Sequence, residues 1–137
     1  MVLYYNYNME KEELRKQYRS VRRCISAKAK KSEMILSKLK NTSCFRSANV
    51  IAVYASLPEE VNTDALIAYA FDCGKRVCLP RIIHKEMVFC EIERHTPLQV
   101  GTFGIREPRS TKIVGAEEIE LMIVPLIAAD KENYRLA

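Results

Sequence analysis

The chain has 137 residues, of which 48% are hydrophobic and 28% are charged. This size and apolar content are typical of one α/β domain with a buried core, and they argue against a second domain, so we expect residues 1–137 to form a single domain. The longest apolar runs are far shorter than a bilayer span, and no basic region precedes an apolar one at the N-terminus. We therefore expect neither a signal peptide nor membrane binding.

The five cysteines are odd in number, and none forms a Cys-x-x-Cys pair. This pattern argues against a disulfide framework and against a zinc site, so we predict no protein metal ligands. A reducing cytoplasm is the location that such cysteines favour.

Basic residues crowd the first forty positions, although the net charge of the whole chain is only +5. They are Lys11, Arg15, Lys16, Arg19, Arg22, Arg23, Lys28, Lys30, Lys31, Lys38 and Lys40. Such a cluster favours a polyanionic partner, which could be a nucleic acid, a nucleoside triphosphate or a polyglutamate chain. A solvated helix face explains any one of these residues equally well, since surface Lys and Arg are common.

Two helices are predicted before the first strand. Good helix formers over Glu10–Arg23, with apolar residues at positions 14, 18 and 21, predict an amphipathic helix with a basic opposite face. The next helix begins with Ser26 as its N-cap and ends at 41–43. Its expected apolar stripe is Met34, Ile35 and Leu39.

A β-α-β unit follows these helices. Asn49–Ala55 is a β-branched run of the kind that is buried on both faces of a parallel sheet. Asp64–Cys73 predicts a helix capped by Thr63 and closed by Gly74, and Lys75–Pro80 predicts the second strand. The crossover between the two strands is expected to be right-handed.

The rest of the chain contains two further predicted strands. Glu86–Ile92 alternates well enough for a third strand, 96–116 reads as mostly loop, and Glu120–Pro125 is the last strand. The predicted fold class is α/β, a three-layer α/β/α sandwich around a doubly wound, mostly parallel sheet. Ligands of such folds bind beyond the carboxyl ends of the strands.

The loop after the first strand therefore becomes the candidate site. Glu59 and Glu60 lie there, between a buried strand and a helix start, and a carboxylate in this place can accept hydrogen bonds from an amino-pyrimidine edge. The alternative is that both acids only favour the positive helix end, an effect of about 0.3–1 kcal/mol.

Several blocks along the chain together resemble the 5-formyltetrahydrofolate cyclo-ligase (methenyltetrahydrofolate synthetase) family. They are Lys11 to Lys16 with Arg19, Tyr54 to Thr63, Val77 to Arg81, Phe103 to Pro108, and Ile123 to Pro125 ahead of Asp130 and Arg135-Leu136. Each block is weak alone, but their shared order and spacing are specific. The resemblance implies an enzyme that uses ATP and Mg²⁺ to convert 5-formyltetrahydrofolate into 5,10-methenyltetrahydrofolate, through phosphorylation of the formyl oxygen and attack by N10.

The resemblance also implies roles for particular residues. Residues of the early helix and of the C-terminal end would bind ATP; they are Lys11, Glu12, Glu13, Leu14, Arg15, Arg135 and Leu136. Glu60 would bind the folate, with Ala55 at the other substrate contact. Arg81 and Arg106 belong to family motifs and receive only an anion-binding role.

One block of the family pattern does not follow in this sequence. After Arg-Leu the family continues into a glycine-rich stretch ending in Gly-Tyr-Tyr-Asp, whereas Ala137 stands here at the position of the first glycine. We therefore identify no catalytic residue and expect a truncated cyclo-ligase with little or no turnover. Asp130 is predicted to start a turn rather than to bind metal.

Two alternatives to a cyclo-ligase remain open at this stage. A folate-binding remnant would keep Glu60 and its pocket without binding ATP. A basic nucleic-acid-binding module would use the early helices, but no aromatic stacking platform is interleaved with the Lys and Arg residues and no recognised nucleic-acid motif is present. We expect a cytoplasmic monomer that binds 5-formyltetrahydrofolate and ATP and no nucleic acid.

Overall fold

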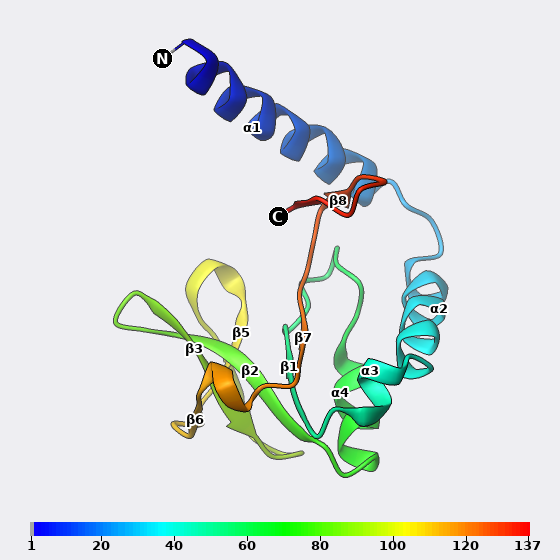
Figure 1. The fold of residues 1–137 in the computed structure, drawn as a ribbon, viewed down its shortest axis with the longest axis vertical. Helices are drawn as coiled ribbons and strands as arrows, with labels where there is room; N and C mark the ends of the chain where they lie inside the picture. The colour runs from blue at the N-terminus through cyan, green and yellow to red at the C-terminus, as the bar shows by residue number, and fades with distance from the viewer. Residues whose placement is uncertain (1) are drawn as a thin grey trace. The chain divides into compact units, whose positions relative to one another are not determined.

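The computed structural model describes the backbone of residues 2–137 and the side chains of residues 10–137. The chain forms two compact units, one from the residues up to Lys28 together with Pro125–Ala137, and one from Ala29–Val124 (Figure 1). None of the described helices combines the length and the apolar character that crossing a bilayer requires. A single domain over residues 1–137 stays a prediction.

The first unit contains one long helix and a short hairpin. Helix α1 (Val2–Arg23) ends where the sequence predicts but begins before Glu10. Strands β8 (Ala128–Ala129) and β9 (Arg135–Leu136) pair antiparallel. Asp130 forms the turn between them, because its Oδ1 accepts the backbone N–H groups of Glu132 and Tyr134, both at 2.9 Å. The predicted turn role of Asp130 is confirmed.

The second unit is built on a five-stranded sheet in the order β6-β3-β2-β1-β7. The strands are β1 (Val50–Val53), β2 (Arg76–Ile83), β3 (Glu86–Ile92), β6 (Ile113–Val114) and β7 (Leu121–Ile123). The pairs β1–β2 and β1–β7 are parallel, and β2–β3 and β3–β6 are antiparallel. The α/β fold class is confirmed, with a mixed sheet that combines both kinds of pairing.

Helix α4 (Asp64–Asp72) connects β1 to β2 and confirms the predicted β-α-β unit. Leu66 and Ala70 are buried, and Gly74 ends the helix in the left-handed conformation with φ of 73°. Thr63 stands at the N-cap position of α4 as predicted, but its hydroxyl makes no capping hydrogen bond and donates instead to the Tyr54 carbonyl at 2.7 Å.

Helices α2 (Lys28–Lys40), α3 (Ser43–Ser47) and α4 lie together on one side of this sheet (Figure 1). Their buried side chains pack against Ile51, Val53, Val77 and Leu79. The opposite face, with Val50, Ala52 and Cys78, packs against Val114, Phe89 and Ile119. The alternation of the strands thus divides the apolar side chains between two faces.

The buried stripe of helix α2 matches the predicted one only at Leu39, which packs against the core. Met34 and Ile35 are 55% and 50% exposed, whereas Leu36 is 5% exposed and Ser32 is 7% exposed. Ser32 tolerates burial because its hydroxyl accepts the backbone N–H of Asn62 at 3.2 Å. The predicted N-cap Ser26 lies two residues before α2, and Ala27 with φ of 52° separates them. Helix α3, capped by the Thr42 hydroxyl, was not predicted.

The segment predicted as loop over 96–116 contains short regular elements. Strands β4 (Leu98–Val100) and β5 (Arg106–Pro108) form an antiparallel hairpin around the 3₁₀ turn η1 (Thr102–Gly104). Strand β6 and a second 3₁₀ turn, η2 (Ala116–Glu118), lead on to β7. The β4–β5 hairpin matters for function because its η1 turn and β5 contribute residues to the site described next.

Candidate functional site

A pocket of about 380 Å³ lies at the carboxyl end of β1, inside the second unit. We call it the strand-end pocket, and its lining residues are Ser56, Leu57, Pro58, Glu60, Asn62, Asp64, Gly104 and Arg106. One wall is the loop from β1 to α4 with the first turn of α4, and the other is the β4–β5 hairpin. This is the place where open α/β sheets bind ligands.

The loop wall is held by hydrogen bonds between side chains and backbone. Thr63 is 1% exposed, its hydroxyl donates to the Tyr54 carbonyl, and its backbone N–H donates to Ser56 Oγ at 3.2 Å. The Tyr54 hydroxyl donates to the Val61 carbonyl at 3.0 Å. Because these bonds span the whole loop, the polar groups of this wall are positioned before any ligand arrives.

Glu60 lines the pocket, as its predicted folate-binding role requires. Its Oε2 accepts the backbone N–H of Leu57 at 2.8 Å, and its own N–H donates to the Leu57 carbonyl at 3.0 Å. This turn fixes the carboxylate on the pocket wall. Ala55, the other predicted substrate contact, is 3% exposed and lies just before the pocket without lining it.

The hairpin wall is connected to the loop wall through Arg106. Its Nη2 donates to Asp64 Oδ1 at 2.8 Å and reaches the Ser56 carbonyl at 3.5 Å. The hairpin itself packs tightly: Glu107 is 6% exposed, its Oε1 accepts the Ile82 N–H at 3.3 Å, and its carboxylate fills the space beside Gly101. Glu107 and Gly101 therefore fix where Arg106 stands.

The predicted nucleotide-binding residues belong to the first unit. Lys11 and Arg15 are one turn apart on α1, and Arg15 Nε donates to the Ala137 carbonyl at 3.0 Å, directly after β9. This bond brings the start and the end of the predicted set together, since Arg135 and Leu136 form β9. The remaining predicted members, Glu12, Glu13 and Leu14, lie on α1 between Lys11 and Arg15.

These residues fit the charge of a triphosphate but do not form a metal site. Lys11, Arg15 and Arg135 supply cationic donors of the kind that phosphate oxygens accept. Among the side chains that the structure describes, no three His, Cys, Asp or Glu residues gather as metal ligands. A magnesium ion bound with a nucleotide takes most of its ligands from phosphates and water.

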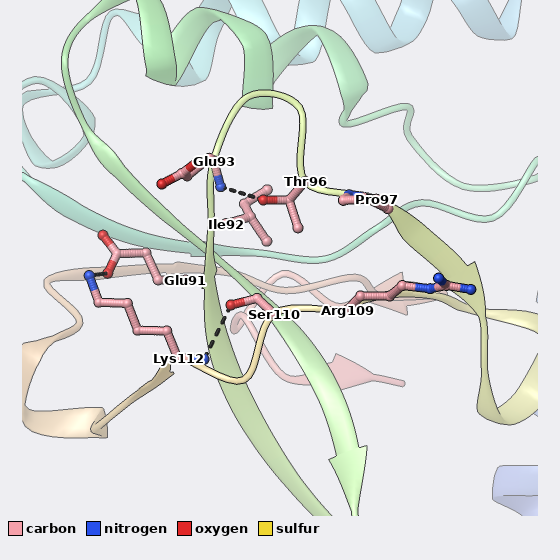
Figure 2. A pocket seen from close by; sticks show the side chains of 8 residues that line it. All are labelled: Glu91, Ile92, Glu93, Thr96, Pro97, Arg109, Ser110 and Lys112. Carbon is pink, nitrogen blue, oxygen red and sulfur yellow. Dashed lines mark hydrogen bonds and ion pairs between the residues drawn. The ribbon is translucent and has the colours of Figure 1, made fainter.

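A second pocket, of about 430 Å³, lies beside β3 in the second unit (Figure 2). We call it the β3 pocket; Glu91, Ile92, Glu93, Thr96, Pro97, Arg109, Ser110 and Lys112 line it. One of its two acidic side chains is already paired: Glu91 contacts Arg76 at 2.8 Å and Lys112 at 2.5 Å. The hydrogen bonds from Arg76 and then Lys112 lower the pKa of Glu91 to about 2.

Arg81 and Arg106, to which the sequence analysis gave only an anion-binding role, lie in different parts of the second unit. Arg81 is half-buried and donates from Nη1 to the Ser110 carbonyl at 2.9 Å, outside the strand-end pocket. Arg106 lines the pocket, and its partner Asp64 was not predicted as a site residue. The available signal was an acidic residue in the first turn of the helix that follows the candidate loop.

An α/β unit with a polar pocket at the carboxyl end of its parallel strands is the arrangement in which many α/β proteins bind small molecules. The model of the 5-formyltetrahydrofolate cyclo-ligase family matches residues 7–137. The chain belongs to this family.

Individual relatives agree with the family match. The 5-formyltetrahydrofolate cyclo-ligase of Haemophilus influenzae is 33% identical over 97 residues, which are 66% of this chain and 51% of that protein. The probable cyclo-ligase of Schizosaccharomyces pombe is 37% identical over 92 residues, covering 63% and 45% respectively. The chain thus spans about half the length of these two relatives.

A solved structure shares the fold. The NMR structure of the Aquifex aeolicus 5,10-methenyltetrahydrofolate synthetase superposes with a TM-score of 0.83 at 31% identity, over 93% of this chain and 66% of that chain. The 5,10-methenyltetrahydrofolate synthetase of Mycoplasma pneumoniae, at 24% identity and a TM-score of 0.69 over 92% of this chain and 70% of that one, supports the fold alone.

Proposed function

We propose that this chain binds 5-formyltetrahydrofolate in the strand-end pocket, as part of the ATP-dependent conversion of that folate into 5,10-methenyltetrahydrofolate. The observation that supports the proposal best is the position of Glu60. This carboxylate lines a pocket at the carboxyl end of β1, in a chain that belongs to the cyclo-ligase family.

The chemistry of the pocket suits a reduced pterin. A carboxylate accepts two parallel N–H groups from an amino-pyrimidine edge, and such hydrogen bonds to a charged acceptor are stronger than neutral ones. Glu60 already receives one backbone N–H through Oε2, so the carboxylate is held in place while it retains acceptor capacity. Leu57 and Pro58 add apolar surface beside it.

In the same proposal, Lys11, Arg15 and Arg135 bind the phosphates of ATP. Bound ATP with Mg²⁺ would supply the phosphoryl group that activates the formyl oxygen. The task of these side chains is to hold the triphosphate and offset its charge, which is the main contribution of proteins to phosphoryl transfer. The Arg15 bond to Ala137 keeps this guanidinium close to the end of β9.

Two measurements on the full chain test the proposal. Titration with 5-formyltetrahydrofolate should show saturable binding that Glu60→Gln weakens, and addition of ATP and Mg²⁺ should produce the absorbance of methenyltetrahydrofolate. Binding without ATP-dependent product would instead identify a non-catalytic folate-binding protein. Absence of folate binding would contradict the proposal.

The nucleotide site has its own test. Lys11→Gln and Arg15→Gln should each weaken ATP binding by about tenfold, because each removes a charged donor to phosphate. Lys16→Gln is the matched control on the same helix, outside the predicted set, and should change ATP affinity less than twofold. Equal effects of all three substitutions would indicate only general attraction by the basic helix. The cytoplasmic location, the monomeric state and the lack of nucleic-acid binding stay predictions.

A further inference from the structure

Arg106 differs in charge from the other ionisable residues of the strand-end pocket. Among the described residues that line this pocket, Glu60 and Asp64 are acidic and Arg106 is the sole basic side chain. A ligand with a negatively charged group therefore meets two groups that repel it and one that attracts it. The position of Arg106 decides where an anionic part of the ligand can lie.

The guanidinium of Arg106 keeps unused donors. An arginine has five N–H donors. Both contacts of Arg106 engage Nη2, with Asp64 Oδ1 at 2.8 Å and with the Ser56 carbonyl at 3.5 Å. Within the part of the chain whose side chains are described, Nε and Nη1 donate no hydrogen bond. The planar guanidinium can bind one carboxylate through two parallel N–H groups, and this side of the group is thus only partly occupied.

Asp64 holds Arg106 weakly enough to be exchanged. The two side chains are 37% and 55% exposed. Ion pairs in contact with water to this extent contribute little to stability, since water screens the attraction and both side chains lose freedom. Asp64 also lies in the first turn of α4, where a carboxylate is favoured without Arg106. Exchange of Asp64 for a carboxylate of a ligand therefore costs little.

We infer that Arg106 binds a carboxylate of the glutamate part of the folate, and that Asp64 occupies the guanidinium until the ligand replaces it. This inference rests on the proposed function. Folates combine a pterin that donates N–H groups with a glutamate that carries two carboxylates. The strand-end pocket offers one group for each part, Glu60 as acceptor and Arg106 as donor. Arg106 is then a specificity-determining residue for glutamate-bearing folates.

The experiment compares two ligands on the full 137-residue chain. One is 5-formyltetrahydrofolate, and the other is the carboxamide of 5-formyltetrahydropteroate, which has the same pterin and aminobenzoyl group but neither a glutamate nor a free carboxylate. Dissociation constants are measured for the unchanged chain and for Arg106→Gln, Arg106→Lys and Asp64→Asn, with thermal unfolding as a check of folding. Arg109→Gln, in the β3 pocket and bonded to Gln99 at 3.2 Å, is the matched control.

The expected pattern separates the two ligands. Arg106→Gln should weaken binding of the glutamate-bearing folate by about tenfold and leave binding of the pteroate carboxamide within twofold, and Arg106→Lys should restore part of the loss. Asp64→Asn should act in the opposite direction and tighten folate binding about two- to threefold, because it removes the competing carboxylate. Arg109→Gln should change neither ligand.

Three results would overturn the inference. If Arg106→Gln weakens both ligands equally, Arg106 only shapes the pocket, and the proposed folate-binding function still stands. If Asp64→Asn weakens the glutamate-bearing folate, the ion pair supports binding rather than competing with it. If the unchanged chain binds neither ligand, the inference and the proposed function fail together.

Discussion

The strand-end pocket and the β3 pocket differ in how Glu60 and Arg106 on one side, and Glu91 on the other, are already bonded. The β3 pocket is the larger, at about 430 Å³ against about 380 Å³ for the strand-end pocket. Its Glu91, however, is paired with both Arg76 and Lys112. In the strand-end pocket Glu60 accepts a backbone N–H and Arg106 retains donors. We therefore base the proposal of the strand-end pocket as the folate site on the hydrogen bonds of its polar groups rather than on pocket volume.

The largest expected effect is the loss of ligand binding in Glu60→Gln. The substitution removes the negative charge that N–H donors of the pterin require, and hydrogen bonds to charged groups contribute about 1.5–3 kcal/mol, or roughly 10- to 100-fold in affinity. Titration with 5-formyltetrahydrofolate measures it. Glu59→Gln, the adjacent acid outside the pocket lining, is the control and should bind as the unchanged chain does. Equal losses in both variants would show that only net charge matters.

Gly101→Ala should disturb the hairpin wall by overpacking. A Cβ at this position meets the Glu107 carboxylate, and the backbone φ of −111° is ordinary, so the cost is steric. We expect a loss of about 1–3 kcal/mol in the free energy of unfolding, together with weaker folate binding because Arg106 shifts. Urea denaturation measures the first effect. The same change made in a Glu107→Ala background should cost less, and equal costs in both backgrounds would contradict the packing account.

Glu91→Gln should affect stability and leave ligand binding unchanged. Because the folded pKa of Glu91, about 2, lies below its ordinary value, its stabilisation is present above the ordinary pKa of about 4.3 and disappears as the pH falls through about 2. We expect about 1–2 kcal/mol at pH 7, reduced because both partners contact solvent. Denaturation of both proteins across pH 2–7 should show curves that converge in acid. Parallel curves, or weaker folate binding, would assign Glu91 another role.

The smallest expected effect is that of Arg109→Gln in the β3 pocket. Arg109 is bonded to Gln99 at the surface, and such exposed contacts change the free energy of unfolding by about 0.5 kcal/mol or less. Folate affinity should stay within twofold. A larger loss of affinity would indicate that the folate binds in the β3 pocket and not at the carboxyl end of β1.

The length and regularity of each element explain which parts of the fold could be predicted from sequence. β3 (Glu86–Ile92) and α4 were found within a residue because their apolar spacing is regular over a full element. β4, β5 and β6 are only two or three residues long, and so short a run has no period to detect. The buried face of α2 was missed because Ser32 is paired with Asn62, thirty residues away.

The residues of the candidate site could likewise be predicted only where a local sequence pattern marks them. Glu60 could be named because it lies in the loop that follows a buried strand, and this is a local signal. The pairing of Arg106 with Asp64 could not, since 42 residues separate them and the hairpin that brings Arg106 to the pocket lay within the predicted loop. Contacts between distant residues depend on the tertiary fold, which local patterns do not determine.

The most direct test of the central claim is a map of backbone amide NMR shifts on titration with 5-formyltetrahydrofolate. We predict saturable shifts at Leu57, Glu60, Asp64 and Gly104, with Glu93, Thr96 and Ser110 unchanged. Shifts confined to the β3 pocket, or no shifts at either pocket, would contradict the assignment of the folate site to the carboxyl end of β1.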